Sequence, residues 1–429
     1  STKKRTIYGR VLVLALSVAM AFSLAACGNS SGGETEKKEW IWVPEFVTID
    51  EENVSTYDMQ LVGGDLYYQS YDYDEETEKS TQSICKYSLA DGSVTQTPLN
   101  YVEEKNWNLN RIAFSQDGSM YGITNVYDED YSKSETFLCK FDAQGNQIFA
   151  EDMTDLVAES YVDSVAIDGE GRVYVSGDTN IWLFDADGNK QGTVSLGSDS
   201  NWIRAMGSDK EGRMYICYNN SGNTVLADVD FDGKKIGSTY ENFPSGNNDR
   251  LMPGIDKDFL VQDGNRVYEY DVKAQKATEL FTWLDSDING NYVQSFGVLE
   301  DGRIVAVTMD WETGDNGIAL LSKTKASEVP QKETIVIGSL YGGSDIQSAA
   351  VKFNKSNDKY RISIRGYLDF NSWDGDDYQA YIADGINRMN NDITSNNCPD
   401  ILDLSGLNIK QLAAKGVFED LGAYLDKSE

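Results

Sequence analysis

The sequence predicts a multidomain protein in which an all-β propeller is followed by an α/β segment. Three observations carry this prediction. A hairpin phrase recurs at intervals of about 40 to 50 residues, which is typical of propeller blades. The hydrophobic periodicity changes after residue 332, where strands begin to alternate with helices. The chain has 429 residues, which is too long for one ordinary hydrophobic core.

The N-terminus has the order of charge, hydrophobicity and small residues that is typical of a signal peptide. A basic segment precedes an apolar run over residues 11–24, and two alanines stand before Cys27. The run is shorter than the roughly 20 residues of a membrane-spanning helix, so a permanent transmembrane anchor is the weaker interpretation. The motif resembles a lipobox, which implies cleavage before Cys27 and a diacylglycerol on its sulfur. We therefore expect a signal peptide over 1–26, a flexible tether over 27–39, and a lipid-anchored protein on the extracytoplasmic face of the cell membrane.

Composition excludes several classes of function. The net charge is −33, with 70 acidic residues against 37 basic ones, so no basic stripe is available to replace the counterions of a nucleic acid. Histidine is absent, which excludes Ser/His/Asp and Cys/His nucleophilic systems and zinc sites with histidine ligands. We expect a protein that has no nucleic-acid partner and no cofactor.

The cysteines do not form a recognisable redox or metal motif. Four follow Cys27, and no two of them stand in a Cys-x-x-Cys arrangement. We expect buried free thiols, and Cys85 with Cys139 is the only pair for which a disulfide is worth testing.

The repeated phrase consists of a strand, an Asp/Gly turn and a second strand of the form Arg-Val-Tyr. It stands at residues 164–175 and returns at 111–123, 204–217 and 295–307. A second hairpin closes on Asp-Gly or Gly-Asn at residues 84–99, 137–149, 181–196 and 225–240. Glycine accepts the positive φ that such turns demand, so two hairpins in succession predict one four-stranded blade.

The spacing of these units predicts six blades within residues 40–325, and seven remain possible. Units begin near residues 56, 108, 161, 202, 251 and 293. The last unit supplies three strands over residues 295–323. The lone strand over residues 40–48 is well placed to be its fourth strand and to close the ring, which removes exposed sheet edges.

Two aspartate-rich turns open like calcium-binding loops. They lie at residues 228–233 and 285–290. Their twelfth positions are Thr239 and Phe296, whereas an EF-hand requires a bidentate Glu there. Ordinary turn chemistry also explains both segments, so we expect no metal site.

The loops that join the second and third strands of each blade share one face of a propeller. Here they carry aromatic residues beside carboxylates, at residues 71–76, 127–131 and 311–312. Aromatic faces near carboxylates are a common way of holding sugar rings, so a glycan or a partner surface could bind there. A solvated acidic rim is the alternative.

After a linker over residues 326–332, strands and helices alternate. We expect strands over 334–340, 360–367 and 400–404, and helices over 344–354, 376–394 and 409–415. Ser344 and Gln347 have the spacing of a capping box at the start of the first helix. This order predicts βαβ crossovers and a parallel sheet.

Two phrases in this segment carry a specific resemblance. They are Pro-Asp-Ile-Leu at residues 399–402 and Leu-Ala-Ala-Lys-Gly at residues 412–416. With them, residues 333–429 resemble the beginning of an extracellular solute-binding protein of the sugar-binding type, the substrate-capturing lipoproteins of ABC importers. The resemblance implies a periplasmic-binding-protein-like α/β fold of two lobes, with the ligand in the cleft between them. Such domains are longer than this segment, so we expect either a fragment of a longer lipoprotein or a cleft that is never completed.

The resemblance also implies a ligand site built from two loops at strand ends and a nearby aromatic ring. The loop after the first strand offers Tyr341, Gly342, Gly343 and Asp345. The loop after the third strand offers Asp403, Leu404 and Ser405, and Trp373 or Tyr378 would stack on a sugar ring. For each of these residues an ordinary role in a loop or a helix cap is the alternative.

Together these expectations describe a membrane-anchored receptor that captures an oligosaccharide or another small solute for the permease subunits of an ABC importer. The propeller would then be an accessory binding domain or a spacer. The alternative is a cell-surface scaffold whose propeller docks a partner protein, without solute capture. A propeller glycosidase is a third interpretation, but paired carboxylates are abundant here by composition alone, so we expect no catalytic residues.

Overall fold

The computed structural model describes residues 39–425, apart from 50–53, 77–78, 104, 129–133, 159–160, 198–200, 245–249, 312–313, 315, 331, 369–376 and 396. Cys27 and the predicted signal peptide therefore lie outside the described residues. Among the helices of the described segments, none is long and apolar enough to cross a membrane. The described residues form two compact units. The propeller unit contains residues 44–282 and 292–322, and the C-terminal unit contains residues 39–43, 283–291 and those from 323 onward.

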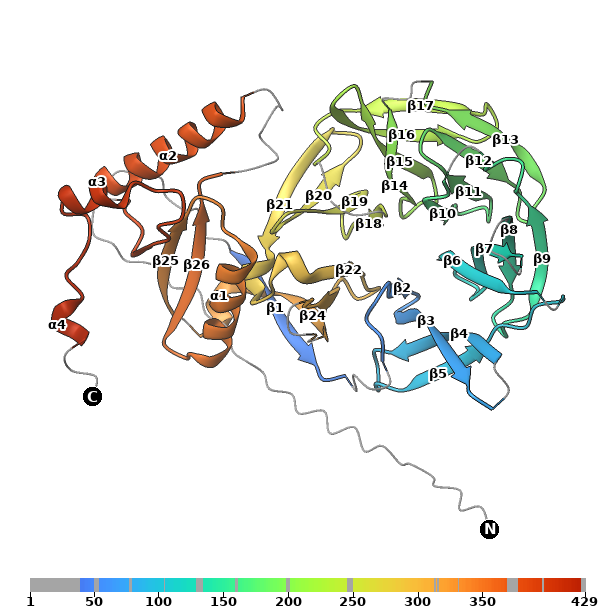
Figure 1. Cartoon of the computed structure of the whole chain (residues 1–429), viewed down its shortest axis with the longest axis horizontal. Helices are drawn as coiled ribbons and strands as arrows, with labels where there is room; N and C mark the ends of the chain where they lie inside the picture. The colour runs from blue at the N-terminus through green and yellow to red at the C-terminus, as the bar shows by residue number, and fades with distance from the viewer. Residues whose placement is uncertain are drawn as a thin grey trace, which may run out of the picture. The chain divides into compact units, whose positions relative to one another are not determined.

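The propeller unit is built from six four-stranded sheets, as far as the described segments show, and these are its blades (Figure 1). The first three are formed by β2 (Gln60–Val62), β3 (Asp65–Asp74), β4 (Lys79–Ser88) and β5 (Val94–Pro98); β6 (Trp107–Phe114), β7 (Met120–Tyr127), β8 (Ser134–Phe141) and β9 (Gln147–Asp152); and β10 (Ser164–Ile167), β11 (Val173–Ser176), β12 (Asn180–Phe184) and β13 (Lys190–Ser195). The prediction of six blades is confirmed, and the seven-blade alternative is wrong.

The next two blades repeat the same order. They are formed by β14 (Trp202–Ser208), β15 (Met214–Asn220), β16 (Asn223–Asp230) and β17 (Lys235–Tyr240), and by β18 (Met252–Pro253), β19 (Phe259–Asp263), β20 (Arg266–Asp271) and β21 (Lys276–Thr282). The sixth sheet has the order β1-β24-β23-β22, from β1 (Trp40–Val47), β22 (Val293–Val298), β23 (Ile304–Met309) and β24 (Asn316–Lys325). The N-terminal strand therefore completes the last blade and closes the ring, as the sequence predicts.

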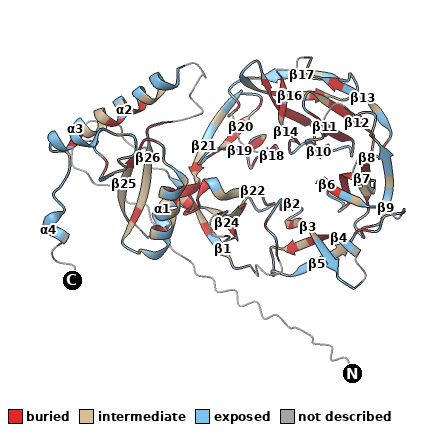
Figure 2. Cartoon of the chain, in the orientation of Figure 1, coloured by how far each residue is buried: buried red, intermediate tan, exposed pale blue. Residues whose placement is uncertain are grey.

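The propeller core lies between neighbouring blades. Tyr174 and Leu183 of the third blade pack in one cluster with Ile216 and Ala227 of the fourth, and all four side chains are buried. The second strands of the blades, such as β7, β11, β15 and β19, are mostly buried, whereas the outer strands β5, β9, β13 and β17 are mostly exposed or half-buried (Figure 2). Each blade thus contributes two apolar faces, and no blade can bury them without a neighbour on either side.

The Arg-Val-Tyr phrase of the repeat stabilises the first turn of a blade. Asp168 accepts the backbone N–H of Arg172 through Oδ1 at 3.0 Å. Its Oδ2 accepts Nε of Arg172 at 2.7 Å and the hydroxyl of Tyr174 at 2.9 Å. Asp209 and Arg213 repeat the arrangement in the next blade, with an Nε to Oδ2 distance of 2.8 Å. The same residues recur in the repeat because they form the same turn in each of these blades: the aspartate accepts the hydrogen bonds that close the turn, and the arginine binds the aspartate.

The C-terminal unit contains a three-stranded parallel sheet with the order β26-β25-β27. Its strands are β25 (Glu333–Ser339), β26 (Tyr360–Gly366) and β27 (Ile401–Leu402), and its helices are α1 (Ser344–Ser356), α2 (Tyr378–Thr394), α3 (Ile409–Ala414) and α4 (Gly422–Leu425). The short 3-10 helices are η1 (Trp283–Ser286), η2 (Gly290–Tyr292) and η3 (Ala326–Glu328). The third strand has two residues, fewer than the five expected.

A buried polar network organises the C-terminal unit around residues 283–291. The carboxylate of Asp287 lies 3.5 Å from the guanidinium of Arg361 in β26. Asn354 of α1 donates to Oδ1 of Asp287 at 3.1 Å, and Arg361 donates to the carbonyl of Leu284 at 3.1 Å. Burial raises the pKa of Asp287, and the positive charge of Arg361 and the amide of Asn354 oppose that shift. In the second calcium-like loop, residues 285–290, the carboxylate of Asp287 therefore binds protein groups of the C-terminal unit.

One sequence expectation about a smaller feature, the capping box at Ser344, is wrong. The N-cap of α1 is Gly343, and Ser344 makes no side-chain cap. The capping box fails because the amide of Gln347 donates to the carbonyl of Gly342 at 2.9 Å.

Cys85 and Cys139 are free and buried, as expected. They lie in different clusters, Cys85 between the last and first blades and Cys139 between the first and second. Cys217 is also free and buried, whereas Cys398 is free and exposed.

Candidate functional site

The two loops that were predicted to hold a ligand come together through Ser339. Strand β25 pairs with β27 in parallel, so the loops that follow both strands leave the same edge of the sheet. The hydroxyl of Ser339 donates to Oδ2 of Asp403 at 2.7 Å and accepts the backbone N–H of Gly342 at 2.9 Å. Ser339 thus joins the loop after β25 to the loop after β27. Ser339 is not among the predicted site residues, although a polar side chain at the end of a buried strand is a sequence signal that could have indicated it.

Asp403 is the acidic group of this site. Burial raises the pKa of its carboxyl, but hydrogen bonds from Ser339 and Ser405 outweigh burial and hold the pKa below its usual range. The backbone N–H of Ser405 donates to Oδ1 at 3.0 Å. The carboxylate therefore stays ionised at neutral pH and can only accept hydrogen bonds.

Tyr341 places an aromatic ring beside these polar groups. Its side chain is 43% exposed, and a Cβ on Gly406 would lie 3.6 Å from its hydroxyl oxygen. Gly406 has a φ of +78°, a conformation that residues with a Cβ rarely adopt. A Cβ at that distance would make ordinary van der Waals contact with the ring, so the glycine at this position is required by the backbone conformation of the second loop.

The remaining predicted residues of the first loop shape the start of α1. Gly342 has a φ of +57°, and Gly343 is the N-cap. Asp345 is exposed in the first turn, where its charge interacts favourably with the helix dipole. The Oγ of Ser344 and the Oε1 of Gln347 are buried without a hydrogen-bond partner. Structural roles therefore account for Gly342, Gly343 and Asp345.

The predicted aromatic partners lie apart from these two loops in sequence. Trp373 lies outside the described residues. Tyr378 begins α2, where its ring lies 6.4 Å from that of Tyr381 between centroids. The structure thus brings the loops of Tyr341, Asp403 and Ser405 together. Tyr341, rather than Trp373 or Tyr378, is the aromatic residue of these loops that could stack on a sugar ring.

The propeller unit has two different faces. On one of them the connections are short Asp/Gly turns, such as residues 168–172 and 209–213. On the other, the second strand leads to the third and the fourth leads to the next blade, through longer connections such as residues 99–106, 153–163 and 241–251. Binding residues are commonly placed on long loops above a rigid scaffold. We call this second face the loop face.

The loop face carries exposed aromatic side chains. The large hydrophobic residues that are exposed there, among the described segments, are Tyr57, Tyr71, Tyr73, Val102, Tyr161, Trp202 and Trp311. Tyr71, Tyr73 and Trp311 stand in the connections predicted to bind a glycan or a partner, whereas Tyr127 is only partly exposed and residues 129–133 lie outside the described part. Tyr57, Tyr161 and Trp202 were missed. Each stands at or just before the first strand of a blade, so an alignment of the repeats to their starts could have found them.

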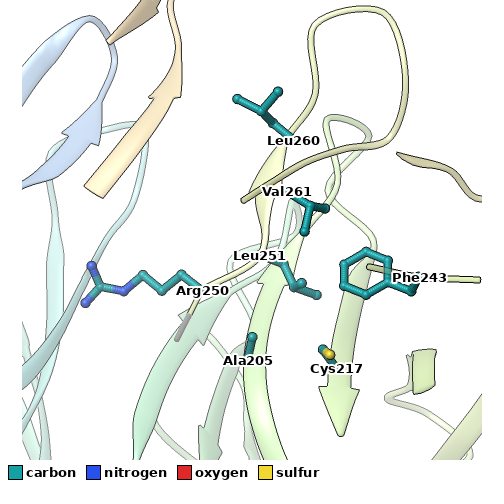
Figure 3. Close-up of a pocket in the computed structure, with 7 residues that line it drawn as sticks. All are labelled: Ala205, Cys217, Phe243, Arg250, Leu251, Leu260 and Val261. Atoms are coloured by element: carbon teal, nitrogen blue, oxygen red, sulfur yellow. The ribbon is translucent and has the colours of Figure 1, made fainter. Parts of the chain in front are cut away.

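The propeller pocket shown in Figure 3 is too small for a cofactor or a sugar. It lies between the fourth and fifth blades and has room for about one water molecule. Its lining residues are Ala205, Cys217, Phe243, Arg250, Leu251, Leu260 and Val261. Burial raises the pKa of Cys217 to about 12, so its thiol is protonated at neutral pH. The side chain of Arg250 extends away from Phe243 (Figure 3).

The first calcium-like turn is also occupied by protein groups. Asp228 accepts the backbone N–H of Ser238 at 3.0 Å and the hydroxyl of Tyr240 at 2.9 Å, and Asp230 accepts the backbone N–H of Gly233 at 2.8 Å. Within the described part of the chain, no cluster of three acidic or cysteine residues is arranged to hold a metal ion.

No protein-family model matches the chain, and no curated protein matches its sequence. Solved structures that resemble it include propellers at low identity. The propeller of Dos1 is 12% identical, with a TM-score of 0.34, covering 59% of this chain and 67% of that one. The propeller domain of the Trilobed protease from Pyrococcus furiosus is 11% identical, with a TM-score of 0.35, covering 63% and 94%. Puromycin hydrolase is 10% identical, with a TM-score of 0.42, covering 71% and 65%.

Proposed function

We propose that this protein is a lipid-anchored, extracytoplasmic solute-binding protein that captures a carbohydrate for an ABC importer. The hydrogen bond between Ser339 and Asp403 carries the proposal, because it joins the two loops from which the sequence resemblance builds a ligand site. The lipobox-like motif at Cys27 supports the extracytoplasmic location. The phrases at residues 399–402 and 412–416 support the relation to the solute-binding proteins of ABC importers.

The chemistry of the two loops suits a neutral polyol. The Asp403 carboxylate accepts hydrogen bonds, so a sugar hydroxyl is a fitting donor. The exposed ring of Tyr341 offers an apolar face to the C–H groups of a sugar ring. Asp345 and Asp403 place two negative charges at this edge of the sheet, which disfavours an anionic solute.

In this proposal, residues 333–429 are the beginning of a solute-binding domain with a periplasmic-binding-protein-like fold. The propeller separates the lipid anchor from the capture domain by about 285 residues and serves as an accessory binding domain. The protein binds its solute and leaves it chemically unchanged.

A cell-surface scaffold is the second candidate. The exposed aromatic residues of the loop face favour it, because they belong to the propeller and not to the capture loops. In that case the propeller docks a partner, and the C-terminal unit captures no solute.

Binding of a glycan panel to the full-length protein tests the proposal by calorimetry. We expect affinity for at least one oligosaccharide and a loss of about ten-fold or more in Asp403→Asn, which removes the charge from the acceptor. Asp384→Asn is the matched control, since Asp384 is a largely exposed carboxylate paired with Arg388 on α2. The proposal is contradicted if no glycan of the panel binds, or if Asp403→Asn and Asp384→Asn lose the same amount of affinity. Co-purification with permease subunits distinguishes an importer from a scaffold.

A further inference from the structure

Two exposed aromatic rings meet on the loop face of the propeller. Tyr57 precedes β2 of the first blade, and Trp311 lies between β23 and β24 of the last. Their ring centroids are 6.4 Å apart, and the ring planes are inclined by 78°. Tyr57 is 63% exposed and Trp311 is 58% exposed, so both rings keep most of their surface in water. We call this pair the aromatic platform.

A hydrogen bond at a buried residue joins the two connections that carry the rings. The hydroxyl of Thr56 donates to Oδ1 of Asn316 at 2.8 Å, and Thr56 is itself fully buried. Asn316 is the first residue of β24, directly after the connection that contains Trp311. The residue before Tyr57 is therefore fixed to the strand that follows Trp311, and the two rings are placed before any ligand arrives. Such preorganisation lowers the entropic cost of binding.

Charged groups stand beside the rings. Asp58 follows Tyr57 with a φ of +51°, a conformation that aspartate tolerates better than most residues. Its carboxylate is exposed and lies 3.7 Å from the guanidinium of Arg250. Arg250 also donates to the carbonyl of Ile112 at 3.1 Å, which fixes its position. The connection that carries the ring of Tyr57 thus also carries a hydrogen-bond acceptor, Asp58, with the donor Arg250 beside that acceptor.

We propose that the aromatic platform is a docking site for a neutral polysaccharide. The C–H groups on one side of a sugar ring carry partial positive charge, and the face of an aromatic ring carries partial negative charge. Two rings nearly at right angles offer two such faces, and Asp58 and Arg250 accept and donate hydrogen bonds to sugar hydroxyls. A polymer suits this arrangement because the platform is open on the surface and does not enclose its ligand.

The composition of the loop face favours a neutral polysaccharide over a membrane. The exposed large hydrophobic residues of this face, within the described segments, are six aromatics and a single aliphatic residue, Val102. Membrane-binding surfaces combine apolar side chains with lysine and arginine, whereas this protein has a net charge of −33. The same charge disfavours anionic polymers.

This site is independent of the proposed solute capture, since it is built only from residues of the propeller unit. A protein that imports nothing would still bind a polymer through Tyr57 and Trp311. Conversely, solute capture at Asp403 does not require the aromatic platform.

Affinity electrophoresis of the full-length protein tests the proposal. Native gels contain mixed-linkage β-glucan, xylan, galactomannan or dextran, with heparin as an anionic polymer. We expect at least one neutral polysaccharide to retard the protein and heparin to leave its mobility unchanged. Trp311→Ala and Tyr57→Ala should each weaken retardation by about ten-fold or more in apparent dissociation constant, and Trp311→Phe should retain part of the binding.

Trp202→Ala is the matched control, because Trp202 is 49% exposed on the same face but lies in another blade. Its retardation should equal that of the unchanged protein, and all variants should keep the same melting temperature because the substituted rings are exposed. The proposal is overturned if no neutral polysaccharide retards the protein, if Trp311→Ala is retarded normally, or if vesicles of zwitterionic or anionic lipid bind through Trp311 while the polysaccharides do not. Oligosaccharide binding that persists in Trp311→Ala but is lost in Asp403→Asn assigns the two sites separately.

Discussion

The carboxylate of Asp287 and the guanidinium of Arg361 lie 3.5 Å apart, and their side chains are only 2% and 4% exposed. Removing one partner of a buried ion pair leaves the other charge without compensation, which costs about 3 to 5 kcal/mol. We therefore expect Asp287→Ala to lower the unfolding free energy of the C-terminal unit by about that amount. Urea denaturation followed by near-ultraviolet circular dichroism measures it.

The control for this substitution is Asp384→Ala, which breaks the exposed pair with Arg388. Exposed pairs contribute at most about 1 kcal/mol, so this variant should unfold nearly as the unchanged protein does. Equal destabilisation by the two substitutions would contradict a special role for Asp287. Replacing both Asp287 and Arg361 by apolar residues should restore much of the stability, because neither buried charge then remains.

Gly212 is expected to be intolerant of a side chain. Its φ is +82°, and a Cβ there would lie 2.5 Å from the Cα of Gly169 in the neighbouring blade, whose N–H donates to the Gly212 carbonyl at 2.9 Å. Gly302 has the same φ, but a Cβ there has nothing within 4 Å. Gly302→Ala should cost about 1 kcal/mol for the backbone conformation alone, and Gly212→Ala should cost clearly more. Similar melting temperatures for the two variants would show that the close approach between blades is unimportant.

The Asp/Gly turns predict a loss of propeller stability in acid. Hydrogen bonds from Asn146 lower the pKa of Asp142, and hydrogen bonds from Ser119 lower that of Asp117. A carboxyl whose folded pKa is below the unfolded value of 3.8 stabilises the fold above that pH, and the contribution disappears as the pH falls through the folded pKa. Thermal unfolding from pH 6 to pH 2 should show this decline. In Asp142→Asn the melting temperature should fall less steeply with decreasing pH. An unchanged pH dependence would contradict a contribution of the turn carboxylates to stability.

The cysteines should differ in their reactivity toward an alkylating reagent. Cys85, Cys139 and Cys217 are buried, whereas Cys398 is exposed. Burial also raises the pKa of Cys139 to about 11, so its thiolate is scarce at neutral pH. Peptide mass spectrometry of the native protein should find Cys398 labelled first, and the other three labelled only after denaturation. Early labelling of Cys217 would contradict its burial between blades.

The propeller was predictable because its signal is local. The turn that contains Asp168, Gly171 and Arg172 uses residues that are adjacent in sequence, so the repeat reveals the blades and their number. The role of residues 40–48 in closing the ring followed from the missing fourth strand of the last blade.

The C-terminal unit was less predictable because its core joins segments that are distant in sequence. Asp287 stands in an aspartate-rich phrase that looks like a metal loop, and only the fold shows that Arg361 occupies its carboxylate. The link between Ser339 and Asp403 spans 64 residues and depends on β25 and β27 being neighbours in the sheet. A capping box was expected at Ser344 from spacing alone, but Gln347 donates to Gly342 instead.

The position of β1 in the last blade also has a consequence for synthesis on the ribosome. Val47 ends β1 and Asn316 begins its partner β24, so 268 residues (316 − 47 − 1) separate them. At translation rates of about 5 to 20 residues per second, the first strand waits roughly 13 to 54 seconds for its partner. The five other blades are all synthesised during that time, so the ring cannot close before β24 has been made.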